Sequence, residues 1–276
     1  MTNYHGYQWS LWYDQESVEG TSDTGASFLA LAHKSELRIS EAPDPVAVAL
    51  SGSVDNTAFT KGVSNVTATI TFNPSGANGL AFIKNFASTD NSFTLIAKAG
   101  SIFQVLRGCK VQNISVNGSL YPSHGPVECT ATIWAWTVNG TEPTTASYES
   151  IPTSFVNWSD VAITLAGSSI TTWWTFSMSI NNDLFRLRSN TGTTTAIHRG
   201  RREVTASVTR TLTDNGTTEF AAGTAATSVA AVFNFVSGTA TFTLSAGAYT
   251  DVEVTHPISG MSGLKTDVKA STLTIS

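Results

Sequence analysis

Apolar and polar residues alternate along much of this chain. In the clearest example, every second residue from 66 to 72 is apolar and the residues between them are threonines. An extended strand turns successive side chains to opposite faces, so this pattern predicts a strand with one buried face. The same alternation returns at residues 127–133, 174–180, 204–208 and 242–244. Because the second face carries mainly small hydroxyl residues, each sheet is predicted to have a dry side and a wet side.

Helical signals are few. The best one covers residues 80–87, where apolar side chains share a face at helical spacing, and a weaker one covers residues 218–226. Prolines such as Pro43 and Pro45 interrupt the alternation and are expected at turns or strand ends. The chain is therefore predicted to be all-β with short helices.

The sequence contains a short internal repeat. Lys61-Gly62 followed by residues 66–71 resembles Arg199-Gly200 followed by residues 204–209, an offset of 204 − 66 = 138 residues, which is half of 276. Phe82 and Phe220 keep this offset, and residues 93–96 match residues 231–234. Upstream, residues 53–56 resemble residues 179–182 at an offset of 179 − 53 = 126. The repeated order of strand, basic-Gly loop, strand, helix and strand indicates a duplicated unit.

A polar stretch separates the two copies. Residues 139–152 are rich in Thr, Ser and Glu, contain prolines and lack apolar periodicity, as linkers do. We therefore predict an N-terminal arm plus a first domain at residues 1–140, a linker at residues 141–152 and a second domain at residues 153–276.

Composition supports a β-rich chain and limits its chemistry. Hydrophobic residues make up 41% and charged residues only 13%, so Thr, Ser, Asn and Gly must cover much of the surface. The formal net charge is −5, and the basic residues cluster only at Arg199, Arg201 and Arg202. Proteins that bind specific duplex sequences normally have a basic face, so no sequence-specific DNA binding is expected.

The start of the chain and its cysteines favour the cytoplasm. Tyr4, His5 and Gln8 interrupt the apolar run that a signal peptide needs, and no segment is apolar enough to span a membrane. Cys109 and Cys129 fall in neighbouring predicted strands but are too few for a disulfide framework. Both are therefore predicted to be buried free thiols.

Catalytic and metal-binding patterns are missing from the sequence. The histidines are far apart, and there is no His-x-x-x-His, no Cys-x-x-Cys and no carboxylate-rich loop at ligand spacing. There is no Gly-x-Ser-x-Gly, and acidic pairs such as Asp14 with Glu16 are interpreted as solvated charges. We predict no catalytic residue, no cofactor and no metal, and hence no enzyme.

Two segments of the second half carry a family resemblance. They are Met-Ser-Ile-Asn-Asn at residues 178–182 and, after a loop, Ile-His-Arg-Gly-Arg-Arg-Glu-Val at residues 197–204. Together they resemble the tail tube proteins of long non-contractile-tailed bacteriophages, in which an amphipathic strand ending in Asn-Asn is followed by a Gly-Arg-Arg/Lys-Glu-Val turn. The hairpin formed by residues 108–111 and 127–131 and the acidic entry at residues 13–21 are similar to the same family. The first copy departs from it, because Lys61-Gly62 is not followed by Arg-Arg-Glu.

The resemblance implies a fold and an assembly. Each tandem domain would be a tail-tube-type β-sandwich or barrel, and sheets from all copies would join into a barrel that lines a channel. A chain with two such domains would form a trimeric, pseudo-hexameric ring, and rings would stack into the tube of a siphovirus tail. The expected partners are other copies of the chain, a tape measure protein, tail-tip and terminator proteins, and transiting double-stranded DNA that is not read by sequence. Assembly in the host cytoplasm, a virion location and no membrane contact follow.

The resemblance also suggests where copies meet. Contacts between rings are expected from the predicted loops 55–61 and 185–202 and from the polar arm before Phe28. The predicted contact residues are Lys61, Arg199, Arg201, Arg202 and Glu203. The tube of a contractile injection machine would share this fold.

Tryptophans leave an alternative function open. Trp134, Trp136, Trp158, Trp173 and Trp174 could line a sugar-binding surface of a β-sandwich. Trp134 and Trp136 share one strand face, however, and Trp174 continues the apolar stripe of its strand, so most are expected in the core or between subunits. The alternative is a carbohydrate-binding module of a tail tip or a cell surface.

Overall fold

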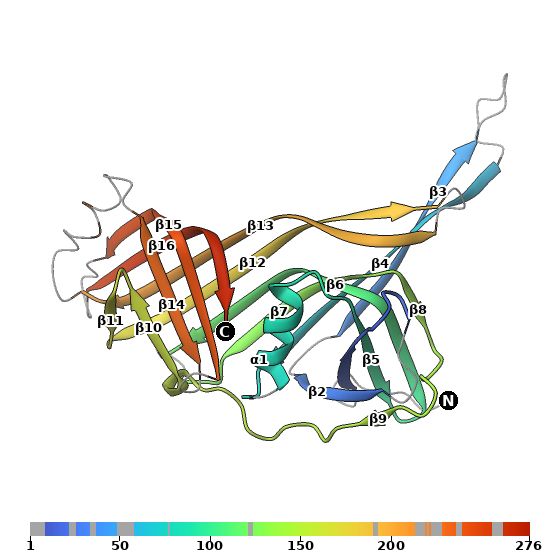
Figure 1. Cartoon of the computed structure of the whole chain (residues 1–276), viewed down its shortest axis with the longest axis horizontal. Helices are drawn as coiled ribbons and strands as arrows, with labels where there is room; N and C mark the ends of the chain where they lie inside the picture. Colours follow the sequence, from blue (N-terminus) through green and yellow to red (C-terminus); the bar gives the residue numbers. More distant parts are fainter. Residues whose placement is uncertain are drawn as a thin grey trace.

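The structure is a computed structural model that describes residues 9–21, 26–33, 37–48, 58–76, 78–120, 124–189, 193–212, 219, 221, 228–235, 239–255 and 262–276. It confirms an all-β fold with a short helical segment. The N-terminal and C-terminal halves of the chain lie side by side, and two long strands of the second half reach across the first half (Figure 1).

The strands of the first half pair antiparallel in one order, and β2 also contacts the end of β4. Their neighbours run β2-β1-β5-β6-β7-β4-β3, and the short β8 pairs with β6. The bounds are β1 (Ser10–Gln15), β2 (Ser27–His33), β3 (Arg38–Val48), β4 (Ala58–Asn73), β5 (Phe93–Ala99), β6 (Ile102–Ser119), β7 (Glu128–Ala135) and β8 (Thr137–Asn139).

The second half repeats this order. Its neighbours run β11-β10-β14-β15-β16-β13-β12, so the counterparts follow one another in the same order as in the first half. One contact of the first half, that of β2 with β4 at Ala32 and His33, has no counterpart among the described strands of the second. The bounds are β10 (Val161–Leu165), β11 (Ser168–Ile170), β12 (Trp173–Arg188), β13 (Thr194–Thr211), β14 (Val229–Phe235), β15 (Ala240–Thr255) and β16 (Gly263–Ile275). The halves are joined where β6 pairs with β12.

The predicted alternation is confirmed in these strands. In β4, Val66, Ala68, Ile70 and Phe72 are at most 1% exposed, while the threonines between them are half-buried. The prediction for Trp174 is wrong. A register shift between Trp173 and Thr175 turns Trp173 into the core and leaves Trp174 half-buried on the other face.

The predicted helix at residues 80–87 is also confirmed. It begins as α1 (Asn78–Phe82) and continues as the π-helical turn η2 (Ile83–Ala87). Phe82 and Phe86 pack with Tyr13, Phe72 and Phe93, with ring centroids 4.6 to 5.6 Å apart. Aromatic rings at this spacing attract one another beyond their burial, so this cluster fixes the helix on the sheets.

The weaker helix predicted at residues 218–226 lies mostly outside the described residues. Glu219 and Ala221 are described and are helical. Glu219 forms an ion pair with Arg210 of β13, which ties this segment to the second half.

Three expectations from the sequence are wrong. Pro43 and Pro45 lie inside β3, beside a register shift, and not at a strand end. The arm before Phe28 is not merely polar, because its described part contains β1, in which Leu11 is fully buried. The counterpart of residues 179–182 is residues 40–43 of β3, because Glu41 lies opposite Val66 as Ile180 lies opposite Val204. It is not residues 53–56, which lie outside the described residues.

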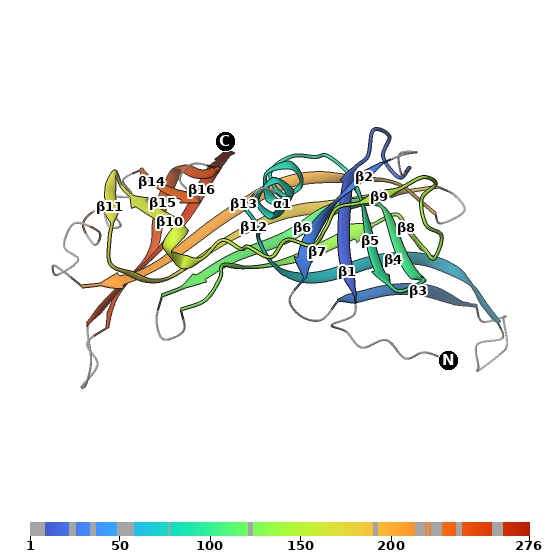
Figure 2. The same cartoon turned by 90° about the horizontal axis from the view of Figure 1, so that it is seen from below.

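The predicted linker is held against the first half. Within it, β9 (Ser147–Tyr148) pairs in parallel with β2, and the Trp12 indole N–H donates to the Glu149 carbonyl at 2.8 Å. The segment then passes beneath the molecule to the 3-10 turn η3 (Trp158–Asp160) and β10 (Figure 2). The linker is polar because it runs along the surface. Its hydrogen bonds to the first half hold it in a defined path.

Cys109 and Cys129 are free thiols and fully buried, as predicted. Burial is the main reason that the pKa of each thiol lies well above its ordinary value. Across the part of the chain that the structure describes, none of the helices has the length and apolar character of a membrane span.

Candidate functional site

One continuous sheet runs through both halves. We call it the long sheet; its strands, in spatial order, are β3, β4, β7, β6, β12, β13, β16 and β15. Every neighbouring pair in it is antiparallel, and it curves from one end of the molecule to the other (Figure 2). The sheet therefore joins the two halves without a break.

The centre of the long sheet is the contact of β6 with β12, which we call the seam. Its register runs from Thr175 opposite Ser119 to Asn181 opposite Asn113. On the dry side of the seam, Ile114, Val116, Met178 and Ile180 are at most 1% exposed. Each such side chain contributes about 1.5–3 kcal/mol by its burial, so the halves are held together mainly by apolar contact.

The other side of the seam is wet. It carries Ser115, Asn117, Ser177, Ser179 and Asn181, all half-buried or exposed. The threonines of β4 continue this face, as do the small polar residues of β13. The prediction of a dry and a wet side is thus confirmed across the join between the halves.

The long sheet does not close on itself within the described residues. β3 pairs only with β4 among the described strands, and beyond Gly247 the described pairing of β15 is with β16 alone. Each end thus presents a row of backbone N–H and C=O groups on its outer side. Natural proteins either cover such edges or use them to bind another strand.

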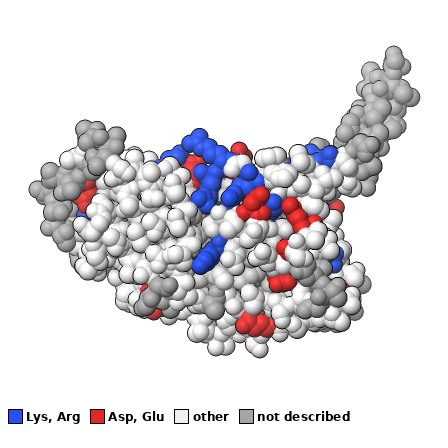
Figure 3. Space-filling view, viewed as in Figure 1, with Lys and Arg blue, Asp and Glu red and all other residues white. Residues whose placement is uncertain are grey.

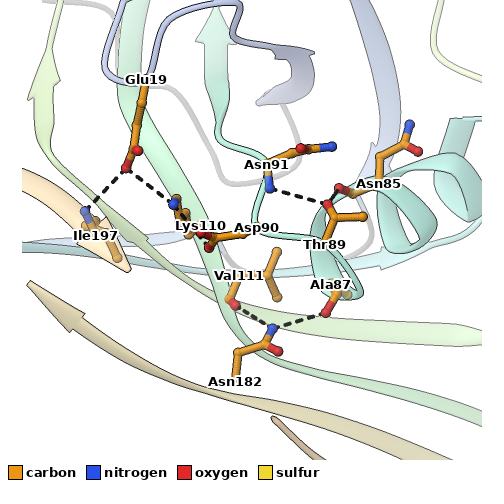
Figure 4. A network of polar contacts seen from close by, with 10 residues as sticks. All are labelled: Glu19, Asn85, Ala87, Thr89, Asp90, Asn91, Lys110, Val111, Asn182 and Ile197. Carbon is orange, nitrogen blue, oxygen red and sulfur yellow. Dashed lines mark hydrogen bonds and ion pairs between the residues drawn. The ribbon is translucent and has the colours of Figure 1, made fainter. Parts of the chain in front are cut away.

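Asn182 fixes the seam to the helix. It is 1% exposed, and its side-chain amide donates to the carbonyls of Ala87 and Val111 at 3.1 and 2.9 Å (Figure 4). These carbonyls belong to η2 and to β6. Because a buried amide needs its hydrogen bonds, this residue sets the position where β12 leaves β6.

Lys110 anchors a second polar network. Its ammonium group lies 3.1 Å from Asp90 and 3.5 Å from Glu19, and the same Glu19 carboxylate accepts from the Ile197 N–H at 3.3 Å (Figure 4). The Lys110 side chain is only 6% exposed, so its charge needs these partners. The network ties β13 to the first half.

The hairpin of β12 and β13 extends beyond the seam, and we call residues 183–201 the arm. The prediction of a loop at residues 185–202 is wrong, since β12 runs to Arg188 and β13 starts at Thr194. Likewise, the predicted loop at residues 55–61 is strand from Ala58 onward, and its earlier residues lie outside the described part. Beyond the seam, the arm extends across the first half towards β3 and β4 (Figure 1).

Two arginines hold the arm in place. Arg186 donates to the Val66 carbonyl at 2.6 Å and lies 4.8 Å from the centre of the Trp134 ring, and Arg188 donates to the Asn65 amide oxygen at 2.8 Å. Burial and the nearby Arg188 charge lower the pKa of Arg186 to about 10, so it stays protonated at neutral pH. The arm is thus docked on the first half by charge-assisted hydrogen bonds.

The predicted contact residues fall into different environments. Arg201 and Glu203 are exposed, and Glu203 forms an ion pair with Lys269, which lowers its pKa. Arg199 is half-buried, and its Nη1 has no hydrogen-bond partner among the described residues. Lys61 is a residue of β4, at a position where only the backbone is described.

Arg202 has an internal role. It donates to the Ser88 carbonyl at 2.9 Å and to the Leu273 carbonyl at 3.1 Å. Burial, and then the neighbouring Arg199 charge, lower its pKa. It therefore links the helical segment to β16 within one chain.

Arg201, Arg202, Glu203 and Lys269 line a groove of about 710 Å³ beside the seam. Lys and Arg side chains gather near the middle of the face in this view, where β12 and β13 pass between the halves (Figure 3). Most of the remaining face is uncharged. Of the predicted contact residues, Arg201, Arg202 and Glu203 thus lie together at this groove, and their contact with another copy stays a prediction. The sequence prediction missed Asn182, Lys110 and Arg186, whose roles depend on contacts between distant segments.

The tryptophans do not form a sugar-binding platform in this chain. The Trp134 ring is covered by Arg186, and the Trp136 ring lies over Gly20 and Gly108, where added Cβ atoms would approach it to 2.2 and 2.5 Å. Trp173 is buried, and the Trp174 N–H donates to the Thr211 hydroxyl at 2.9 Å. Trp158 is half-buried beside His124.

Metal-binding side chains are also dispersed. Among the described residues, no three His, Cys, Asp or Glu side chains lie close enough together to hold a metal ion.

Comparison with known proteins gives a family for this chain. No curated protein sequence is significantly similar to the chain. A solved structure of the anti-feeding prophage cap, a tube-terminating cap, is similar with a TM-score of 0.36 and 14% identity, covering 46% of this chain and 95% of that one. The sequence profile described as phage tail tube protein matches residues 6–273, almost the whole chain, and this protein therefore belongs to the phage tail tube protein family.

Proposed function

We propose that this chain polymerises as stacked rings into the tube of a long, non-contractile phage tail and thereby forms the conduit for DNA delivery. As a member of the tail tube family it is a component of the virion. The observation that carries the proposal is the long sheet, which has a dry face, a wet face and an open edge at each end among the described strands. Closing several such sheets into one barrel removes every edge.

The repeated strand order supports a ring of three chains. Each half contributes four strands to the long sheet, β3, β4, β7 and β6 from the first and β12, β13, β16 and β15 from the second. Two tandem units per chain would give a trimer with six equivalent units. Such a closed cyclic assembly leaves no unpaired sheet edge.

The wet face suits a channel. Its Thr, Ser and Asn side chains present hydroxyl and amide groups, and the chain has a net charge of −5. A surface without a continuous basic stripe does not hold phosphates tightly, so double-stranded DNA would pass without being read by sequence. A tape measure protein in the lumen and tip and terminator proteins at the two ends would be the other partners.

Electron microscopy and mass measurement of the purified chain test this function. We expect rings and tubes as the concentration rises, with three chains per ring in native mass spectrometry and sixfold pseudo-symmetry in end-on class averages. Persistent monomers at high concentration, with or without a tail-tip extract as a nucleus, would refute the assembly. A sheath around the tubes in the parent virion would instead identify a contractile machine.

A further inference from the structure

The two strands that correspond to those of the seam lie at the two ends of the long sheet, and each has one edge that, along at least part of its length, is without a partner strand among the described residues. In the repeated strand order β6 corresponds to β15, and β12 corresponds to β3. Over residues 113–117, β6 pairs with β7 on one side and with β12 on the other. Over residues 251–255, β15 pairs with β16 alone among the described strands, and β3 pairs with β4 alone.

Two register shifts align β6 with β15. One lies between Val111 and Asn113 and the other between Tyr249 and Asp251. The offsets are 249 − 111 = 138 and 251 − 113 = 138, the same as in the sequence repeat. Position by position, β15 therefore follows β6 at an offset of 138 residues.

The partners of β4 and β13 align β3 with β12. Ile180 lies opposite Val204, and Glu41 lies opposite Val66. Since Val66 and Val204 are equivalent in the repeat, Glu41 is the equivalent of Ile180, at an offset of 180 − 41 = 139. This offset between β3 and β12 is one residue larger than the offset of 138 between β6 and β15.

We infer that β15 of one copy pairs antiparallel with β3 of the next copy, in the register of the seam; this inference rests on the proposed function. Transferring the offsets gives the pairs between copies. They are Arg38 opposite Thr255, Ile39 opposite Val254, Ser40 opposite Glu253 and Glu41 opposite Val252.

The dry side of both edges is incomplete in a single chain. Val252 and Val254 are half-buried, whereas their equivalents Ile114 and Val116 at the seam are fully buried. Ile39 is also half-buried and packs at the margin of the core. Pairing of the two edges would cover these side chains and bring Ile39 against Val254. On the same face Glu41, the equivalent of Ile180, would place a carboxylate opposite Val252, so the apolar contact is smaller than at the seam.

The wet side has complementary charges. Asp251, Glu253 and Asp267 lie around Lys265, whose pKa is raised mainly by its hydrogen bond to Asp267 and further by the other two carboxylates. Arg38 would lie opposite Thr255 and diagonally across from Glu253. Diagonal neighbours in antiparallel strands are within reach of long side chains, so this arginine would add a positive charge where carboxylates are in excess.

Pro43 marks the end of the expected pairing. At the seam, pairing ends at Asn181, after which Asn182 turns into the core. The equivalent of Asn182 in β3 is Pro43, by 182 − 43 = 139. Proline lacks the N–H that would continue a ladder, so β3 can pair only up to Ala42, as the seam requires.

The same residue equivalences between the halves indicate which segment of the next copy would fill the groove beside the seam. The arm of β12 and β13 rests on Asn65 and Trp134 of its own chain. Their equivalents in the second half are Glu203 and Lys269, because Thr67 lies opposite Trp134 and Thr205 lies opposite Lys269. Both line the groove of about 710 Å³. The hairpin of β3 and β4 from the next copy, the counterpart of the arm, would occupy that groove.

Cysteine pairs can test the register directly. The double variant Ser40→Cys with Glu253→Cys is expected to form disulfides between chains in assembled tubes, so oxidised samples run as covalent multimers without reductant. Ser115→Cys with Ser179→Cys is the matched control inside one chain, since these residues lie opposite each other at the seam. Native Cys109 and Cys129 give little background because both are fully buried.

A shifted pair gives the negative control. Ser40→Cys with Asp251→Cys moves one partner by two residues along the same face, where the Cα atoms would be roughly 7–8 Å apart, too far for ready bridging. We expect several-fold less covalent multimer from this pair. If tubes form and the seam control oxidises, but the Ser40/Glu253 pair does not cross-link or the shifted pair cross-links equally well, the register is wrong while the tube function stands.

Hydrogen exchange of the unmodified chain covers the case in which a variant does not assemble. On tube formation, amides within residues 38–42 and 251–255 should become protected, while those of residues 113–117 and 175–181 are already protected in the monomer. Tubes in which the two edges exchange as fast as in the monomer would overturn the inference. Absence of any assembly by the unmodified chain would refute the proposed function first.

Discussion

Gly108 and Ala246 occupy equivalent bends 246 − 108 = 138 residues apart, and both have a left-handed backbone, with φ of 61° and 49°. At Gly108, β6 passes from its pairing with β5 to its pairing with β7. At Ala246, the pairing of β15 with β14 comes to its end at Gly247, while β15 pairs with β16 on both sides of the bend. The same local geometry is thus made once with glycine and once with alanine. Only glycine adopts this conformation without strain.

Swapping glycine and alanine should have opposite effects on stability at the two bends. Gly108→Ala places a Cβ 2.5 Å from the Trp136 ring in addition to the backbone strain, so we expect a loss of about 2–4 kcal/mol in the free energy of unfolding. Ala246→Gly removes strain at an exposed position and should be neutral or stabilising by about 0.5–1 kcal/mol. Urea denaturation of both variants measures this; a loss of stability in Ala246→Gly would show that its backbone is not strained.

Asn182→Asp should destabilise the junction of the halves. The change removes the donor to two carbonyls and puts a carboxylate against them, which costs about 3–5 kcal/mol for a buried uncompensated charge. Burial raises the pKa of the new carboxyl above its unfolded value, so the deficit should shrink as the pH falls towards the unfolded pKa and grow as the pH rises through the folded one.

The matched control is Asn181→Asp, because Asn181 is the exposed neighbour on the wet side. It should change the free energy of unfolding by less than about 0.5 kcal/mol at any pH between the unfolded and folded pKa values of the new carboxyl in Asn182→Asp. Denaturation curves at several pH values compare the two variants. Equal, pH-independent effects at the two positions would contradict the assigned role of Asn182.

Arg186→Lys should loosen the arm. Lysine keeps the charge but loses the planar group that lies over the Trp134 ring while donating to the Val66 carbonyl, so we expect a loss of about 1–2 kcal/mol. Trypsin cleaves after either residue, which makes cleavage rates in the arm comparable between the two proteins. Faster cleavage is expected in the variant, and Arg201→Lys, at an exposed site, should cleave as the unmodified chain does. An unchanged rate in Arg186→Lys would show that the arm is held by other contacts.

Local patterns in the sequence predicted the individual elements well. Alternation identified β4 and the dry sides of β7, β13 and β15, since burial on one face imposes its own period on the sequence. It misplaced Trp174 because a single bulge reverses every side chain beyond it. The loop expected at residues 185–202 is strand because the arm docks on the first half, through contacts such as that of Arg186 with the Val66 carbonyl.

Contacts between distant segments were harder to predict. Nothing local distinguishes Asn182 from Asn181, and only the approach of the Ala87 and Val111 carbonyls gives the former its role. The repeat at an offset of 138 was visible where strands are paired on both sides, as in β4 and β13. It was misassigned upstream at residues 53–56, because β3 at the edge carries charged and proline residues where β12 carries apolar ones.

Charge reversal at two adjacent arginines separates folding from assembly. Arg202 donates to the Ser88 and Leu273 carbonyls, so Arg202→Glu should lose about 2–4 kcal/mol of unfolding free energy, since two carbonyls lose their donor and face a carboxylate. Arg201 is exposed and lines the groove, so Arg201→Glu should leave the free energy of unfolding within about 0.5 kcal/mol but weaken tube formation. Lys84→Glu makes the same charge change at an exposed helical site and should alter neither property. Sedimentation of tubes beside thermal melts distinguishes these outcomes: tubes of Arg201→Glu that form as readily as those of Lys84→Glu would exclude the groove from the contact between copies.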